Sequence, residues 1–165
     1  MGLKERFASR QLPQVVYPLR MDFSPESDAA ERELAAAESE LAYATSQGFV
    51  DLGGYRRRVE AARQARDAYY EFLTIKALPP AEFEELVGAH PASEEQRKKN
   101  GPAAVWNIDT FVPALLAASV ESDMTADDWA EVTSKGPIAT GEVAGLFQAA
   151  LQVNDRTPDE HLGKG

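Results

Sequence analysis

The sequence predicts an all-α protein: a long antiparallel helical hairpin, then a compact bundle of short helices, with an extended N-terminal arm in front. Two observations lead to this fold class: apolar residues recur at helical spacing over 24–77, and several short amphipathic stretches with helix start signals follow over 78–154. We expect four parts, namely the arm over 1–23, the hairpin over 24–77, the short-helix bundle over 78–154 and a flexible tail over 155–165.

The arm differs from the rest of the chain in charge and in pattern. Its bases outnumber its acids, and residues 19–23 alternate between apolar and polar side chains, which is the period of a strand. Pro18 cannot donate to a ladder, so the stretch fits an edge strand or an extended segment. With no second strand evident, we expect an extended, loosely packed arm. Addition to the sheet edge of another subunit is the alternative.

The first helix of the hairpin begins at Ser24, a good N-cap that is followed by Pro25 at the first helical position. Its apolar positions step by three and four residues, which is a heptad seam made mostly of alanine. Gly48 is expected to end this helix. The seam residues are Ala30, Leu34, Ala37, Leu41 and Ala44.

The second helix is expected over 55–77. It is richer in bases than the acidic first helix, which suits an antiparallel hairpin within one chain and equally suits pairing between chains. We interpret the arginines at 56–58 as a solvated face rather than a phosphate site, because consecutive residues point in different directions. The expected seam is Tyr55, Val59, Ala62, Tyr69, Phe72 and Leu73.

Prolines and polar residues shape the next part of the chain. Pro79 and Pro80 break the hairpin helix, and a short helix is expected over 80–87. The polar stretch 92–104 predicts a mobile loop.

Three short helices are then expected between residues 106 and 154. Asp109 or Thr110 is expected to cap the first, and with Thr110 as cap Pro113 lies in its first turn. Thr125 is expected to cap the second, with a capping-box partner at Asp128. Thr140 is expected to cap the third.

Several classes of function are disfavoured by composition. The chain has no cysteine, which excludes disulfides and thiolate zinc sites, and its net charge of −10 argues against nucleic-acid binding. No apolar run is long enough to cross a membrane, and no signal peptide is apparent. His90 and His161 do not form a metal-binding pair, and no paired catalytic set or nucleotide-binding motif appears. We therefore expect no enzymatic activity, no cofactor and no metal.

Residues 55–154 resemble the tail assembly chaperones of long-tailed (siphovirus-type) bacteriophages that infect actinobacteria. The segment at 106–119 (Trp-Asn-Ile-Asp-Thr-Phe-Val-Pro-Ala-Leu-Leu-Ala-Ala-Ser) carries most of this resemblance. Residues 78–91, Met124-Thr125 with Trp129, and 141–154 follow in the expected order. Residues 1–23 carry little of it.

The resemblance implies a protein that binds and solubilises the tape measure protein and helps recruit tail tube subunits. It further implies action in the host cytoplasm, absence from the mature virion, several copies acting together, and a longer form made by ribosomal frameshifting. Gly163 and Lys164 fit a slippery codon pair, and an ordinary flexible tail is the alternative there.

Partner-binding residues are expected among the large apolar side chains of 106–154, with Trp106 foremost because it directly follows the predicted loop. A small acidic helical adaptor or inhibitor that binds a basic host protein is the alternative function, motivated by the net charge. The expected partner-binding residues are Trp106, Phe111, Leu115, Trp129, Leu146, Phe147 and Leu151.

Overall fold

The computed structural model describes residues 2–101 and 104–155. The chain forms two compact units, one made of residues 1–17 and 73–165 and the other of residues 18–72. It passes between them twice, within strands β1 (Gln14–Arg20) and β2 (Tyr70–Lys76). Most of the predicted tail at 155–165, including the predicted frameshift signal, lies outside the described residues.

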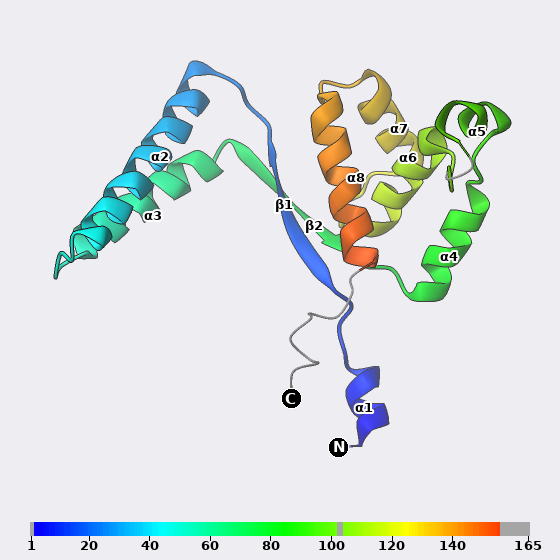
Figure 1. The fold of residues 1–165 in the computed structure, drawn as a ribbon, viewed down its shortest axis with the longest axis horizontal. Coiled ribbons are helices and arrows are strands. Elements are labelled where there is room, and N and C mark those ends of the chain that lie inside the picture. Colours follow the sequence, from blue (N-terminus) through cyan, green and yellow to red (C-terminus); the bar gives the residue numbers. More distant parts are fainter. Residues whose placement is uncertain (1, 102–103, 156–165) are drawn as a thin grey trace. The chain divides into compact units, whose positions relative to one another are not determined.

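The predicted all-α class is wrong, because β1 and β2 form a two-stranded antiparallel sheet (Figure 1). β1 lies in the predicted arm, and β2 lies where the second hairpin helix was expected. That helix, predicted over 55–77, ends at Asp67. Residues 70–76 are rich in aromatic and β-branched side chains, which favour a strand once a partner strand is available. Pairing with β1 outweighs the helical spacing of the apolar residues in this stretch.

The register of the sheet follows from two flanking hydrogen bonds. Met21 N–H donates to the Tyr69 carbonyl at 2.9 Å, and Ala77 N–H donates to the Pro13 carbonyl at 2.8 Å. Odd-numbered residues of the two strands therefore face each other in hydrogen-bonded pairs. Even-numbered residues direct their backbone N–H and C=O groups to the outer edges.

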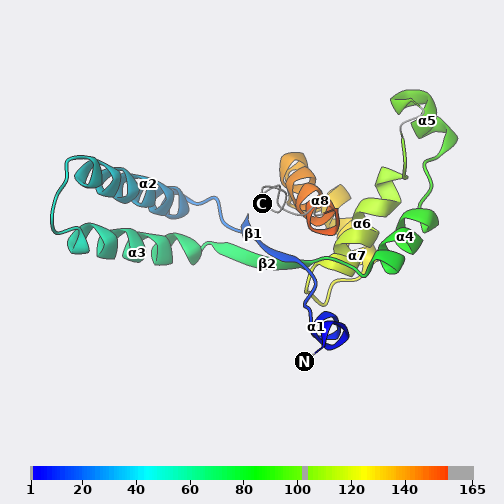
Figure 2. The same ribbon diagram turned by 60° about the horizontal axis from the view of Figure 1, so that its bottom comes forward.

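Unit 18–72 contains helices α2 (Pro25–Ser46) and α3 (Gly53–Asp67), which pack side by side (Figure 2). Ser24 caps α2 as predicted, and Gly48 has the positive φ of 71° expected after the end of a helix. Two of the four buried residues between these helices are alanines, so the helices approach closely. These buried residues are Leu34, Ala37, Val59 and Ala62, and exposed ion pairs join Arg58 to Glu33 and Glu40, and Arg63 to Glu38.

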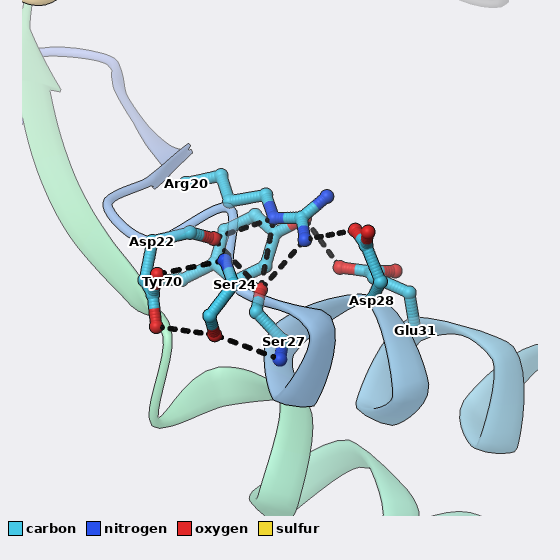
Figure 3. Close-up of polar contacts among 7 residues, drawn as sticks. All are labelled: Arg20, Asp22, Ser24, Ser27, Asp28, Glu31 and Tyr70. Carbon is cyan, nitrogen blue, oxygen red and sulfur yellow. Dashed lines mark hydrogen bonds and ion pairs between the residues drawn. The ribbon is translucent and has the colours of Figure 1, made fainter.

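A polar network fixes the start of α2 (Figure 3). The Arg20 guanidinium donates to the buried Ser27 hydroxyl at 2.7 Å and to the Asp28 carboxylate at 2.6 Å. Asp22 accepts hydrogen bonds from the hydroxyl and the N–H of Ser24, which lower the pKa of the Asp22 carboxyl. These donors and acceptors satisfy one another, so the cluster holds the entry to the helix.

The other unit contains α1 (Leu3–Ala8), α4 (Pro80–Ala89), α5 (Glu94–Asn100), α6 (Ile108–Ser119), α7 (Ala126–Lys135) and α8 (Thr140–Asn154). Two of these helices were not predicted. α1 lies in the predicted extended arm, and α5 occupies the predicted loop at 92–104, where Ser93 and Gln96 form a capping box. The core of this unit joins β2, α6, α7 and α8 through Ile75, Phe111, Leu115, Leu116, Val120, Trp129, Leu146, Ala150 and Val153.

Tyr17 of β1 packs against α8 at Gly145. A Cβ atom added at Gly145 would lie 2.4 Å from the Tyr17 hydroxyl oxygen, but 3.5 Å from the nearest ring carbon. The absence of a side chain at Gly145 therefore makes room for one atom, the phenolic oxygen.

We expect Gly145→Ala to lower the free energy of unfolding by about 1–3 kcal/mol, because the added methyl group overpacks this contact. Tyr17→Phe in the same chain removes the clashing oxygen and is expected to restore most of the loss. Urea denaturation of the two single variants and the double variant measures this coupling. If Gly145→Ala lowered the free energy of unfolding by the same amount in the chain with Tyr17 and in the chain with Tyr17→Phe, the contact would be contradicted.

Candidate partner-binding groove

Helix α6 begins one turn earlier than predicted. The Asn107 side chain accepts the Asp109 N–H at 3.1 Å, which makes Asn107 the N-cap and Ile108 the first helical residue. The predicted caps, Asp109 and Thr110, lie inside the helix. Pro113 consequently lies in the second turn, where it is buried, and not in the first turn as expected.

The residues before α6 are fixed by hydrogen bonds to other helices. Asn107 N–H donates to the His90 carbonyl at 2.8 Å, and Gln96 of α5 donates through Nε2 to the Asn107 side chain at 2.9 Å. The His90 ring nitrogen Nδ1 lies 2.9 Å from the Thr110 hydroxyl. His90 therefore helps to hold the start of α6 through both its carbonyl and its ring.

Helix α7 begins with the predicted capping box. The Thr125 hydroxyl accepts the Asp128 N–H at 3.2 Å, and the Asp128 carboxylate accepts the Thr125 N–H at 2.8 Å. The hydrogen bonds from Thr125 lower the pKa of the Asp128 carboxyl. Trp129 follows in the first turn and is buried in the core.

The depressed pKa predicts how the contribution of Asp128 depends on pH. A carboxyl whose pKa is lower in the folded chain stabilises it above the ordinary value of 3.8, and this stabilisation disappears as the pH falls through the folded-state pKa. We expect Asp128→Asn to be less stable than the unmodified protein at pH 7, and the difference to shrink below pH 3.8. Urea denaturation at both pH values measures it. A difference that is independent of pH would contradict this role of the charge.

Both ends of α8 are held by side-chain hydrogen bonds. Ala139, and not the predicted Thr140, is the N-cap, because Glu142 accepts the Ala139 N–H at 2.8 Å. At the other end, the Asn154 side-chain oxygen accepts the Leu78 N–H at 2.7 Å. The helix is thereby fixed against the segment that follows β2.

Helices α6, α7 and α8 enclose a groove with a volume of about 540 Å³, which is the size of a typical ligand pocket. All three helices contribute apolar side chains to its walls. Ile108 is 51% exposed and is the most exposed large apolar side chain among the lining residues. The apolar lining residues are Ile108, Val112, Pro113, Ala130, Val143, Ala144 and Phe147.

The structure separates the predicted partner-binding residues into two groups. Four of them are buried in the core, and the other three are partly buried against it. Only Phe147 lines the groove. The buried residues are Phe111, Leu115, Trp129 and Leu146; the partly buried ones are Trp106, Phe147 and Leu151.

Three aromatic rings connect the groove to the core. Trp106 stacks on Phe111 with ring centroids 4.9 Å apart, and Phe147 meets both rings edge-on at 6.2 and 6.0 Å. Phe111 lies at the bottom of this cluster with no exposed surface. Any shift of Phe147 caused by a bound partner would therefore change the surroundings of the Trp106 ring.

Sequence reasoning missed most of the groove. Ile108 and Val112 lie four residues apart on α6, and Val143 and Phe147 do so on α8, so each pair shares one helix face. This four-residue spacing is visible in the sequence. The sequence does not single out these faces, because α6 is apolar almost all round.

The groove has the properties of a helix-binding site. Its walls are apolar, its polar lining groups are hydroxyls, one amide and the Asp109 carboxylate, and no basic side chain lines it. An amphipathic helix docks in such a groove by inserting apolar side chains spaced three or four residues apart. The Asp109 carboxylate and the lack of lining bases favour a helix that carries a base beside its apolar anchors.

Within the described residues, no cluster of three or more metal-ligating side chains occurs, and no helix is both long and apolar enough to cross a bilayer. Comparison of the chain with protein-family models, with curated proteins and with solved structures finds no match.

Proposed function

We propose that the chain is a tail assembly chaperone of a long-tailed bacteriophage and that it binds amphipathic helices of the tape measure protein in the α6–α8 groove. One observation carries the proposal. Two segments that resemble this family, 106–119 and 141–154, supply the α6 wall, most of the α8 wall and all three rings of the aromatic cluster, and the α7 wall directly follows the third, Met124-Thr125 with Trp129.

The proposal includes the other properties that the resemblance implies. Tail tube protein is a second partner, and further copies and a longer frameshifted form act beside this chain. It acts in the host cytoplasm, leaves before the virion is complete and has no enzymatic activity. Many weak helix–groove contacts along one long client would add up through avidity.

Co-expression with the tape measure protein of the same phage tests the proposal. The unmodified chain is expected to keep the tape measure protein in solution and to co-purify with it. The double variant Ile108→Glu/Ala144→Glu is expected to lose both properties, because two carboxylates enter the apolar wall. Both positions tolerate glutamate in the folded chain, since Ile108 is the first residue of α6 and Ala144 is exposed.

Val105→Glu is the matched control, since Val105 is 60% exposed, lies three residues before Ile108 and does not line the groove. A tape measure protein that is equally insoluble with and without the unmodified chain, and that forms no complex with it, would overturn the proposal. Binding that survives the double variant but collapses with salt would instead favour the acidic adaptor.

A further inference from the structure

Helix α1 presents an apolar face that nothing in the described structure covers. The helix has six residues and none is buried. Leu3 and Phe7 lie four residues apart, so they share one face, and they are 63% and 60% exposed. Arg6 and Arg10 line the same hollow as Leu3 and Phe7, so positive charge lies beside this face in a chain whose net charge is −10.

A helix this short is not stable alone in water, because nucleation costs more than a single turn returns. Two large exposed apolar side chains on one face mark a surface that binds another surface. The features of α1 are those of a docking segment: two apolar anchors at i and i+4, with bases beside them.

The α6–α8 groove is complementary to this segment. It offers apolar walls, the exposed side chain of Ile108, and the Asp109 carboxylate, with no base in its lining. A positively charged amphipathic helix is the partner that such a groove prefers. The same chain thus contains an apolar, positively charged segment, α1, and a groove that suits it.

The groove of a second copy is a better match than the groove of the same chain. No residue of α1 lines the groove in the described structure. The chain after α1 is anchored at Pro13, whose carbonyl accepts the Ala77 N–H, and at Tyr17, which packs on Gly145. Gly145 does not line the groove either.

We propose that α1 of one copy docks in the α6–α8 groove of a second copy. Because α1 and the groove are different surfaces of one chain, this contact is heterologous and joins copies head to tail, into a ring or an open chain. A client helix would compete with α1 for the groove; this competition, unlike the docking itself, rests on the proposed function.

Two variants of the full chain test the docking. Leu3→Glu/Phe7→Glu removes the anchors of α1, and Ile108→Glu/Ala144→Glu spoils the groove. Sedimentation velocity across a concentration series is expected to show self-association of the unmodified chain, weakened on the order of a hundredfold in each variant because apolar anchors are replaced by charges. Circular dichroism and thermal melting of each variant show that the chain still folds, and Val105→Glu is expected to associate normally.

Mixing the two variants gives the decisive result. The first keeps an intact groove and the second an intact α1, so an equimolar mixture is expected to form a complex of two molecules and nothing larger. A monomeric unmodified chain at all concentrations, undiminished association in either variant, or no complex in the mixture would each overturn the proposal. Docking within one chain would appear as a monomer whose Trp106 emission changes in Leu3→Glu/Phe7→Glu, and it too would overturn it.

The outcomes separate this inference from the proposed function. If the two variants pair but the chain does not bind the tape measure protein, the docking is supported and the chaperone function is refuted. Capture of tape measure protein by a chain that stays monomeric would do the reverse.

Discussion

Replacing Phe111 by alanine is expected to lower the free energy of unfolding by about 3–5 kcal/mol, the usual cost of removing a large buried aromatic side chain. Phe111 has no exposed surface and packs against the rings of Trp106 and Phe147, with the His90 ring 6.2 Å away. Its removal leaves a cavity beneath the groove and withdraws the support of both neighbouring rings.

Tryptophan fluorescence during urea denaturation measures this effect, since both tryptophans lie in the unit made of residues 1–17 and 73–165. Phe7→Ala is the matched control, studied at a dilution where the chain is monomeric. It makes the same exchange in the same unit at an exposed position, and its effect is expected to stay within about 0.5 kcal/mol. A Phe111→Ala variant as stable as this control would mean that the aromatic cluster does not support the fold.

Replacing Asn154 by leucine is expected to cost about 1–3 kcal/mol, because buried polar groups would lose their partners. The Asn154 side chain accepts the Leu78 N–H and donates to the Ala150 carbonyl at 2.8 Å and to the buried Ser119 hydroxyl at 3.4 Å. Leucine has a similar size but no hydrogen-bonding groups in its side chain. The Leu78 N–H and the Ser119 hydroxyl would therefore lose their hydrogen bonds to residue 154.

Gln152→Leu is the control for this variant, as it exchanges an amide for leucine at an exposed position two residues earlier on α8. Urea denaturation at pH 7 compares the two. Hydrogen exchange at Leu78 adds a local measurement, since its amide is expected to exchange faster in Asn154→Leu but not in Gln152→Leu. Equal stability of both variants would show that the Asn154 contacts are dispensable.

Local features of the fold could be predicted from the sequence because their causes lie within a few residues. Ser24 and Thr125 cap their helices through groups three residues away, and Gly48 ends α2 through its own backbone freedom. Helix α5 also has a local start signal. Its capping box, Ser93 with Gln96, was readable, but the polar composition of the stretch outweighed it.

Features that depend on distant residues could not be predicted in this way. The stretch 70–76 has a mixed pattern, and only pairing with β1, more than fifty residues earlier, makes it a strand. The groove has a similar origin. Val112 and Val143 are ordinary apolar residues of amphipathic helices, and only the packing of α6 against α7 and α8 turns them into facing walls.

The register of the two-stranded sheet also limits how the sheet can grow. Even-numbered residues of β1 turn their backbone groups outward, and Pro18 is one of them, so the N–H that proline lacks is missing from the outer row of donors. A foreign strand laid along this edge would lose a hydrogen bond at the middle of β1. Amyloid-like stacking of copies through continuous backbone pairing is therefore interrupted at Pro18, even though the strand carries exposed valines at 15 and 16.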